Sequence, residues 1–147
     1  MPSKLLSLTL YSLAALTLVN LVHAADPSIT FISPDQVKNI GDTAELVCIV
    51  KDAQYIVEWG KGDKPGNISE RIAVESQIAS ADKAKRFKVT VKDTTVGESP
   101  VSTYTLQIKD VRACDAGVYE CQILFLENLT TKQTRLTVQG APPSDKC

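Results

Sequence analysis

The sequence predicts an all-β fold, an antiparallel two-sheet sandwich of eight or nine short strands with Greek-key connections. After residue 24, apolar and polar residues alternate in short runs that are separated by Gly, Pro, Asn and Asp, as is typical of strands and turns. Helical periodicity is almost absent, and only Gln77–Lys85 has a helix-friendly composition. We expect that segment to be a loop with at most a single helical turn.

The strands expected in the first half alternate cleanly enough to assign their faces. In the run TAELVCIV, Leu46 and Cys48 fall on one face and Glu45 on the other, and in YIVEW, Tyr55 and Trp59 share a face. Gly and Pro in KGDKPGN predict a loop over Lys61–Asn67. The expected strands are Ile29–Ser33, which Pro34 ends, Gln36–Ile40, Thr43–Val50, Tyr55–Trp59 and Ile72–Glu75.

The second half continues the same pattern. Inward positions of its strands include Phe87, Leu106, Tyr119 and Cys121, and Thr94–Pro100 is expected to turn the chain. The expected strands are Arg86–Val91, Thr103–Ile108, Gly117–Phe125 and Thr134–Val138.

The first 24 residues differ from the rest and resemble a secretory signal peptide. Lys4 precedes an apolar run from Leu5 to Val22, and the segment ends Val-His-Ala, which favours cleavage after Ala24. The alternative is an uncleaved membrane anchor. We therefore expect a secreted product with a single domain at 25–140 and a short tail at 141–147. The tail lacks the hydrophobic stretch of a lipid-anchor signal, so no membrane insertion is expected after cleavage.

Composition argues against several classes of function. Without Lys4 the chain has fifteen basic and seventeen acidic side chains, so no basic field is expected to hold nucleic acid. The only histidine, His23, leaves with the leader, which removes imidazole from catalysis and from metal binding. The cysteine spacing does not fit a zinc site, and no phosphate or calcium loop occurs. We expect no enzyme activity, no cofactor and no metal.

Four cysteines in a secreted chain predict up to two disulfides in one of three pairings. Cys48 and Cys121 both point inward from expected strands, and the layers of a sandwich are close enough for a bridge. Closing this loop stabilises the fold by about 4 kcal/mol in the chain-entropy model. Trp59 is expected to pack on the sulfurs, and Tyr119 is placed to bond back to the turn before it.

The residues that carry these roles resemble an immunoglobulin domain of the V or I set. The pattern is Cys48…Trp59…Leu106-x-Ile108-x-Asp110…Asp115-Ala116-Gly117-Val118-Tyr119-x-Cys121. The stretches SPDQVKNIGDTAELVC and STYTLQIKDVRACDAGVYECQI are similar to the first immunoglobulin domain of the insect lachesin family and its IgLON-like neuronal adhesion relatives. The resemblance implies a salt bridge between Arg86 and Asp115. Family members carry several domains and an anchor, so we expect a short secreted relative, a truncated form or a piece of a longer gene product.

The two remaining cysteines, Cys114 and Cys147, are expected at the same pole of the sandwich. Eight residues separate Gln139 from Cys147, a reach of about 25 Å when extended. We therefore predict a second disulfide, Cys114–Cys147. The alternative is an intermolecular bridge through Cys147.

Outward positions on one sheet predict a partner-binding face that is more apolar than a solvated sheet requires. The resemblance implies that the same face mediates first-domain pairing in lachesin-like proteins. The alternative is that a bulge after Ile123 buries Leu124 or Leu126. The predicted contact residues are Ile56, Glu58, Gln122, Leu124, Leu126 and Arg135; Glu120, Gln133 and Leu129 lie on the same outward line.

Two sequons, at Asn67 and Asn128, agree with export, and a glycan on Asn128 is expected to flank the predicted face. The leading functional hypothesis is a secreted module of the cell-adhesion or neuronal-recognition type. It would bind another immunoglobulin-superfamily protein or itself. The alternative is a soluble humoral factor of host defence that binds microbial or damaged surfaces. Tissue expression and a pull-down against extracellular proteins distinguish the two.

Overall fold

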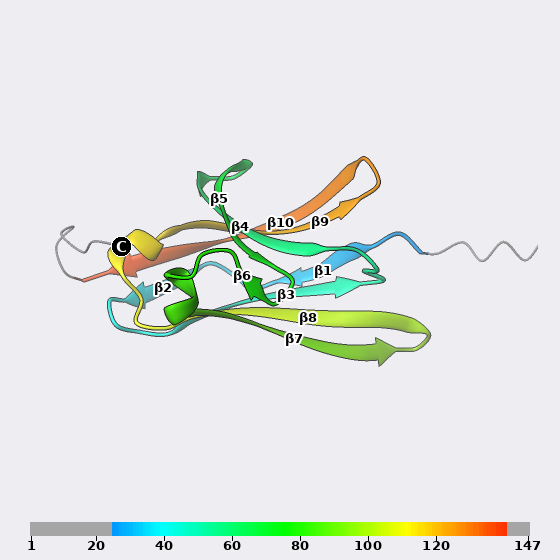
Figure 1. The fold of residues 1–147 in the computed structure, drawn as a ribbon, viewed down its shortest axis with the longest axis horizontal. Coiled ribbons are helices and arrows are strands. Elements are labelled where there is room, and N and C mark those ends of the chain that lie inside the picture. The colour runs from blue at the N-terminus through cyan, green and yellow to red at the C-terminus, as the bar shows by residue number, and fades with distance from the viewer. Residues whose placement is uncertain (1–24, 141–147) are drawn as a thin grey trace, which may run out of the picture.

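The computed structural model describes residues 25–140, which fold as the predicted two-sheet sandwich (Figure 1). One sheet has the strand order β1-β3-β8-β7 and the other β2-β10-β9-β4-β5-β6. The first sheet consists of β1 (Ser28–Ile32), β3 (Ala44–Lys51), β7 (Phe87–Val96) and β8 (Ser99–Ile108). The second consists of β2 (Gln36–Asn39), β4 (Val57–Lys64), β5 (Asn67–Val74), β6 (Gln77–Ile78), β9 (Gly117–Phe125) and β10 (Asn128–Gln139).

Every strand pair is antiparallel except β2 with β10, which is parallel. The exception arises because the chain changes sheets at Ser33. Its hydroxyl accepts a hydrogen bond from the Val47 N–H, and its own N–H donates to the Val47 carbonyl. Pro34 follows, where it cannot extend β1. The chain then joins the edge of the other sheet as β2.

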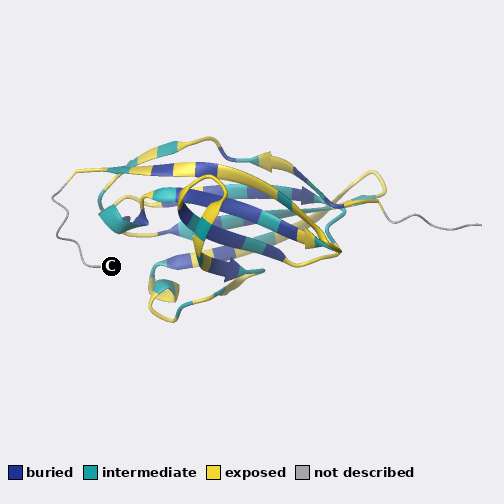
Figure 2. Ribbon diagram, turned by 90° about the horizontal axis from the view of Figure 1, so that it is seen from above, coloured by how far each residue is buried: buried dark blue, intermediate teal, exposed yellow. Residues whose placement is uncertain are grey.

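The core lies between the two sheets and consists of the inward positions that alternation predicts. Leu46 and Leu106 face each other across β3 and β8 and are completely buried. The Cys48–Cys121 disulfide predicted from the sequence joins the sheets, with a Cα–Cα distance of 6.4 Å. Trp59 is directly opposite Cys121 on the neighbouring strand and is 1% exposed. Buried residues occupy the middle of the strands, and exposed ones gather toward the hairpin ends (Figure 2).

Four expectations about the strands were wrong, each for a local reason. Thr94–Pro100 was expected to turn the chain, but β7 and β8 stay paired up to Val96 and Ser99, so only residues 97 and 98 form the turn. Tyr55 precedes β4 in an irregular segment and is 36% exposed, so it does not share the inward face of Trp59. The segment Lys61–Asn67 is mostly strand, and only residues 65 and 66 form the turn. The last strand begins at Asn128, six residues before the expected start. It pairs with the whole of β9, and a turn of only two residues, 126 and 127, joins the two long strands. The single helical turn in Gln77–Lys85 is present at Lys83–Lys85.

Candidate binding face

The side chains that point away from the core on β4, β9 and β10 form one surface, which we call the outer face. Directly paired residues on neighbouring strands share a face, so the strand register defines its rows. Glu58 is opposite Gln122, and Leu124 is opposite Leu129. Ile56 immediately precedes β4. Because Val57 pairs with Ile123, Ile56 lies beside Leu124, the residue after Ile123, and belongs to the same row.

The end of the outer face near the β9–β10 turn is apolar and open to solvent. Leu124 is 62% exposed, Leu129 56% and Ile56 55%. Leu126, at the turn itself, is 78% exposed. No bulge reverses the alternation after Ile123, since Leu124 remains outward and Ile123 is fully buried. We call Ile56, Leu124, Leu126 and Leu129 the apolar patch.

The middle of the outer face is covered by the β4–β5 hairpin, which Figure 1 shows standing above the layer of β9 and β10. Two glycines in β4 permit this bend. A Cβ on Gly60 would lie 2.6 Å from the Ile68 Cγ2, and one on Gly62 would lie 1.9 Å from the Asn67 carbonyl oxygen. Glu120, expected to point to solvent, is only 4% exposed beside Gly60. The part of the outer face that remains open to solvent is therefore the end near the β9–β10 turn.

The predicted contact residues do not all gather in one place. Glu58 and Gln122 adjoin the apolar patch, and Glu58 forms an ion pair with Arg71 at 3.2 Å. Arg135 is opposite Val118, six residues along β10 from Leu129, and lies near Pro65 and Asp35 at the other end of the face. Arg135 is thus separate from the patch by about 20 Å of strand.

Sequence reasoning missed an aromatic pair at the edge of the patch. The rings of Tyr55 and Phe125 lie 4.5 Å apart, centroid to centroid, at an angle of 54°. Phe125 is on the opposite side of β9 from Leu124, and Tyr55 reaches it from the irregular segment before β4. Alternation could not have found this contact, because one of its members is outside any strand.

The opposite pole of the domain is held by a buried ion pair between Arg86 and Asp115, which the sequence resemblance implied. The guanidinium donates two hydrogen bonds to the carboxylate, at 2.8 and 3.0 Å, and the Asp115 side chain is 2% exposed. This hydrogen bonding raises the pKa of Arg86. The Tyr119 hydroxyl donates to the Asp115 carbonyl, and burial raises the pKa of that phenol. These contacts fix the turn before β9.

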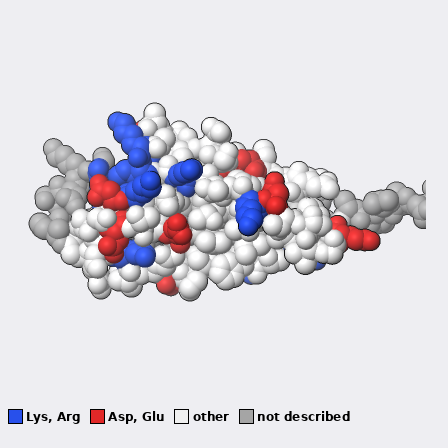
Figure 3. All heavy atoms as spheres, turned by 90° about the horizontal axis from the view of Figure 1, so that it is seen from below, with Lys and Arg blue, Asp and Glu red and all other residues white. Residues whose placement is uncertain are grey.

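Other charges near this pole are also paired. Lys83 contacts Glu70 at 3.1 Å, and Lys85 contacts Asp82 at 3.1 Å. On the face shown in Figure 3, acidic side chains lie close to the Lys and Arg side chains instead of leaving a continuous basic surface. Lys61 donates a hydrogen bond to the Cys114 carbonyl, and its burial, with Lys83 nearby, lowers its pKa.

The remaining predicted sites are placed as follows. Asn67 and Asn128 are both exposed, Asn67 in the β4–β5 hairpin and Asn128 at the start of β10. Cys114 is disulfide-bonded, but Cys147 lies outside the described residues, so the predicted Cys114–Cys147 pair stays a prediction. The segments predicted as signal peptide, 1–24, and as tail, 141–147, lie outside them as well. Residues 25–140 contain no cluster of potential metal ligands and no helix with the length and hydropathy to cross a membrane.

Comparison with known proteins agrees with this architecture. The model of the immunoglobulin V-set domain matches residues 33–139. Lachesin of Schistocerca americana is 39% identical over 119 residues, which cover 79% of this chain and 32% of the relative. Lachesin of Drosophila melanogaster is 31% identical, covering 79% and 30%, and Protein amalgam of the same fly is 30% identical, covering 79% and 34%. The chain spans about a third of the length of these relatives.

Among solved structures, the chain is similar to the crystal structure of Dpr1 IG1 bound to DIP-eta IG1. The TM-score is 0.60 at 22% identity, and the match covers 80% of this chain and 99% of that one. A second similar structure is Dpr2 Ig1-Ig2 in complex with DIP-Theta Ig1-Ig3, with a TM-score of 0.56, 19% identity, and coverage of 78% and 34%. At this level of identity the likeness shows the fold.

Proposed function

The chain belongs to the immunoglobulin V-set family, and we propose that it is a secreted recognition module that binds another immunoglobulin-superfamily protein or a second copy of itself. The observation that carries this proposal is the apolar patch. Leu124 and Leu129 are directly opposed and more than half exposed at the open end of the outer face. Exposed contiguous apolar surface marks contact sites between proteins.

The relatives support the class of partner. The similar solved structures are complexes in which one immunoglobulin domain binds another, namely Dpr1 IG1 with DIP-eta IG1 and Dpr2 with DIP-Theta. The sequence likeness to lachesin favours a recognition role of the neuronal type. A catalytic role receives no support from the described residues, whose buried charges are engaged in structural contacts such as Arg86–Asp115.

The position of the Asn128 sequon is compatible with a glycosylated form that still binds. Asn128 is paired with Phe125, whereas Leu129 is paired with Leu124, so Asn128 and the apolar patch lie on opposite sides of the β9–β10 hairpin. A glycan on Asn128 would then emerge behind the patch instead of flanking it. Asn67 is in the β4–β5 hairpin, away from the β9–β10 turn.

An extracellular interaction screen tests the proposal. The mature, glycosylated protein is screened against extracellular immunoglobulin-superfamily domains and against itself, and each hit is measured again with Leu124→Asp. We expect this variant to fold normally and to lose the association, because it places a charge in the centre of the patch.

The matched control is Val37→Asp. Val37 is 59% exposed on β2 of the same sheet, where it is paired with Thr137, about 27 Å along β10 from Leu129. This variant should bind like the wild type. Undiminished association of Leu124→Asp, or equal loss in both variants, would reject the proposed surface.

A further inference from the structure

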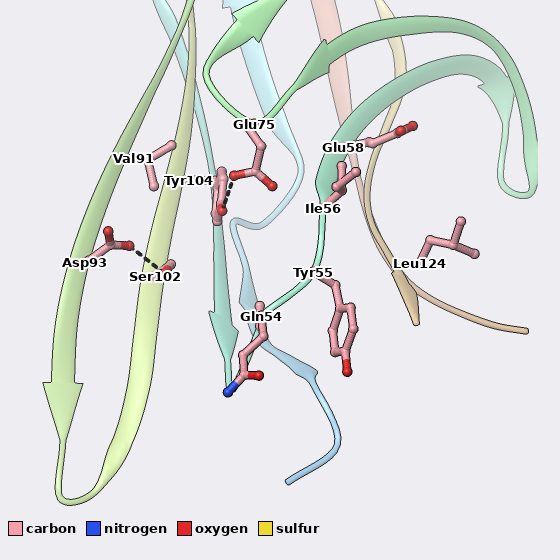
Figure 4. Close-up of a pocket in the computed structure, with 11 residues that line it drawn as sticks. Gln54, Tyr55, Ile56, Glu58, Glu75, Val91, Asp93, Ser102, Tyr104 and Leu124 are labelled. Atoms are coloured by element: carbon pink, nitrogen blue, oxygen red, sulfur yellow. Dashed lines mark hydrogen bonds between the residues drawn. The ribbon is translucent and has the colours of Figure 1, made fainter. Parts of the chain in front are cut away.

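A pocket of about 670 Å³ opens beside the apolar patch, between the β7–β8 hairpin and the segment before β4 (Figure 4). Ile56, Glu58 and Leu124 line both the pocket and the outer face, so the two surfaces are continuous. The far wall comes from the other sheet, through Val91 and Tyr104. The pocket is therefore within reach of a side chain of a partner seated on the patch.

Glu75 is held rigidly on the floor of the pocket. One carboxylate oxygen accepts a hydrogen bond from the Val57 N–H and the other accepts one from the Tyr104 hydroxyl, both at 2.7 Å. Its backbone has φ of 51°, a left-handed conformation that residues other than glycine seldom adopt. Such strain tends to persist where surrounding contacts impose it, often at functional sites. The carboxylate is thus pre-positioned before any partner arrives.

The charges around the pocket are of one sign. Glu58, Glu75 and Asp93 line it, and no Lys or Arg does so within the described part of the chain. Arg71 pairs with Glu58, but in residues 25–140 no cation lies within ion-pair distance of Glu75 or Asp93. Among the described residues, the Asp93 carboxylate accepts a hydrogen bond only from the Ser102 hydroxyl, at 2.6 Å. Burial and the bond to Glu75 raise the pKa of Tyr104, so its phenol stays a donor.

The walls between these carboxylates are apolar or aromatic. Val91, Ile56 and Leu124 provide aliphatic surface, and Tyr55 contributes a ring that is already fixed against Phe125. This combination suits a side chain with an aliphatic stem and a cationic end. The stem packs on the apolar walls, and the cation approaches the carboxylates and the face of an aromatic ring.

We propose that this pocket receives an arginine side chain of the protein that binds the apolar patch. The inference rests on the proposed function, because it assigns one anchoring residue of that partner. Arginine suits the pocket better than lysine, since its planar guanidinium can donate to several carboxylate oxygens of the lining and its flat face can pack on an aromatic ring.

Methyl NMR titration of the mature domain with N-acetyl-arginine amide tests the pocket without a known partner. We expect saturable shifts of the Ile56, Val91 and Leu124 methyl groups. N-acetyl-citrulline amide, which has nearly the same shape and no charge, should produce none. Asp93→Asn keeps an acceptor for Ser102 and should weaken arginine binding about tenfold, in line with the loss of a hydrogen bond to a charged group.

The matched control is Glu98→Gln, which removes one charge from the turn of the same hairpin outside the pocket. It should bind the arginine probe like the wild type, and amide spectra should show that both variants are folded. Absence of the methyl shifts, equal shifts with citrulline, or equal weakening by Glu98→Gln would overturn the proposal. Leu129→Asp changes the patch but not the pocket lining, so it should abolish association and leave the probe-induced shift of Val91 in place. Failure of the pocket and failure of the patch therefore give different results.

Discussion

Leu124 on β9 and Leu129 on β10 are directly opposed, whereas Asn128, one residue earlier, is opposed to Phe125. Successive residues of a strand point to opposite faces, so the hairpin has a leucine side and a sequon side. In the sequence Asn128 is four residues after Leu124 and one before Leu129, which suggested that the glycan and the leucines share one surface. The register separates them.

This separation predicts that the position of a glycan decides whether the domain binds. Asn128→Gln should remove a glycan and leave association unchanged. Thr131→Asn together with Gln133→Thr creates a sequon at a residue opposite Gln122 on the outer face, and its glycan should abolish association by steric exclusion. Sedimentation velocity of the secreted variants, with glycan occupancy checked by mass spectrometry, distinguishes the two. Loss of binding in Asn128→Gln would contradict the assignment of sides.

Leu126 predicts a conflict between stability and recognition. It is 78% exposed and has φ of 52°, which is costly for a bulky side chain, and the turn would suit glycine better. Leu126→Gly should leave the free energy of unfolding unchanged or raise it by up to about 1 kcal/mol, while it weakens association. Urea unfolding and a binding titration measure the two quantities. A variant that is clearly less stable, or that binds as well as the wild type, would show that the leucine is not retained for contact.

The Arg86–Asp115 pair predicts a large structural effect at the pole remote from the patch. Arg86→Met leaves the 2% exposed Asp115 carboxylate without its cation and should lower the free energy of unfolding by about 3–5 kcal/mol. Arg71→Met breaks an ion pair whose arginine is 63% exposed and should cost at most about 1 kcal/mol. Chemical denaturation of both variants checks the contrast. Equal costs would mean that Asp115 is adequately held by the Arg112 N–H and other local contacts.

Tyr104 predicts a specific loss of stability in alkali. Burial, and then the hydrogen bond to Glu75, raise the pKa of its phenol above the ordinary value near 10. The folded protein therefore keeps a proton that the unfolded chain releases, and stability falls as pH rises above about 10. Tyr104→Phe should be less stable at neutral pH by about 1 kcal/mol but should lose less stability between pH 9 and 11. Parallel curves for the two proteins would contradict the role of this phenol.

The sequence predicted the sandwich well because its core residues obey a simple alternation. Leu46, Cys48 and Leu106 in one sheet, and Trp59 and Cys121 in the other, are buried where period two places them. The same reasoning failed for Glu120. Its outward position was correct, but the β4–β5 hairpin bends over it, and alternation along a single strand carries no information about such a cover.

The bend of the β4–β5 hairpin depends on a glycine that the sequence pattern had assigned to a loop. Gly62 contributed to the prediction of a loop, because glycine interrupts strands. In the structure it is part of β4, and it is glycine because the Asn67 carbonyl occupies the space of a side chain. The pocket at Glu75 was also unpredictable, since its residues come from five separate segments and both sheets. Their proximity is a property of the fold.

Hydroxyl-radical footprinting of the domain, free and bound to itself or to a partner found by the interaction screen, tests the central claim most directly. We expect protection on binding at Ile56, Leu124 and Leu129, with no change at Val37 or at Phe31, which is 43% exposed on the other sheet. Protection at Phe31 or Val37, with the three patch residues labelled as strongly as in the free domain, would contradict it.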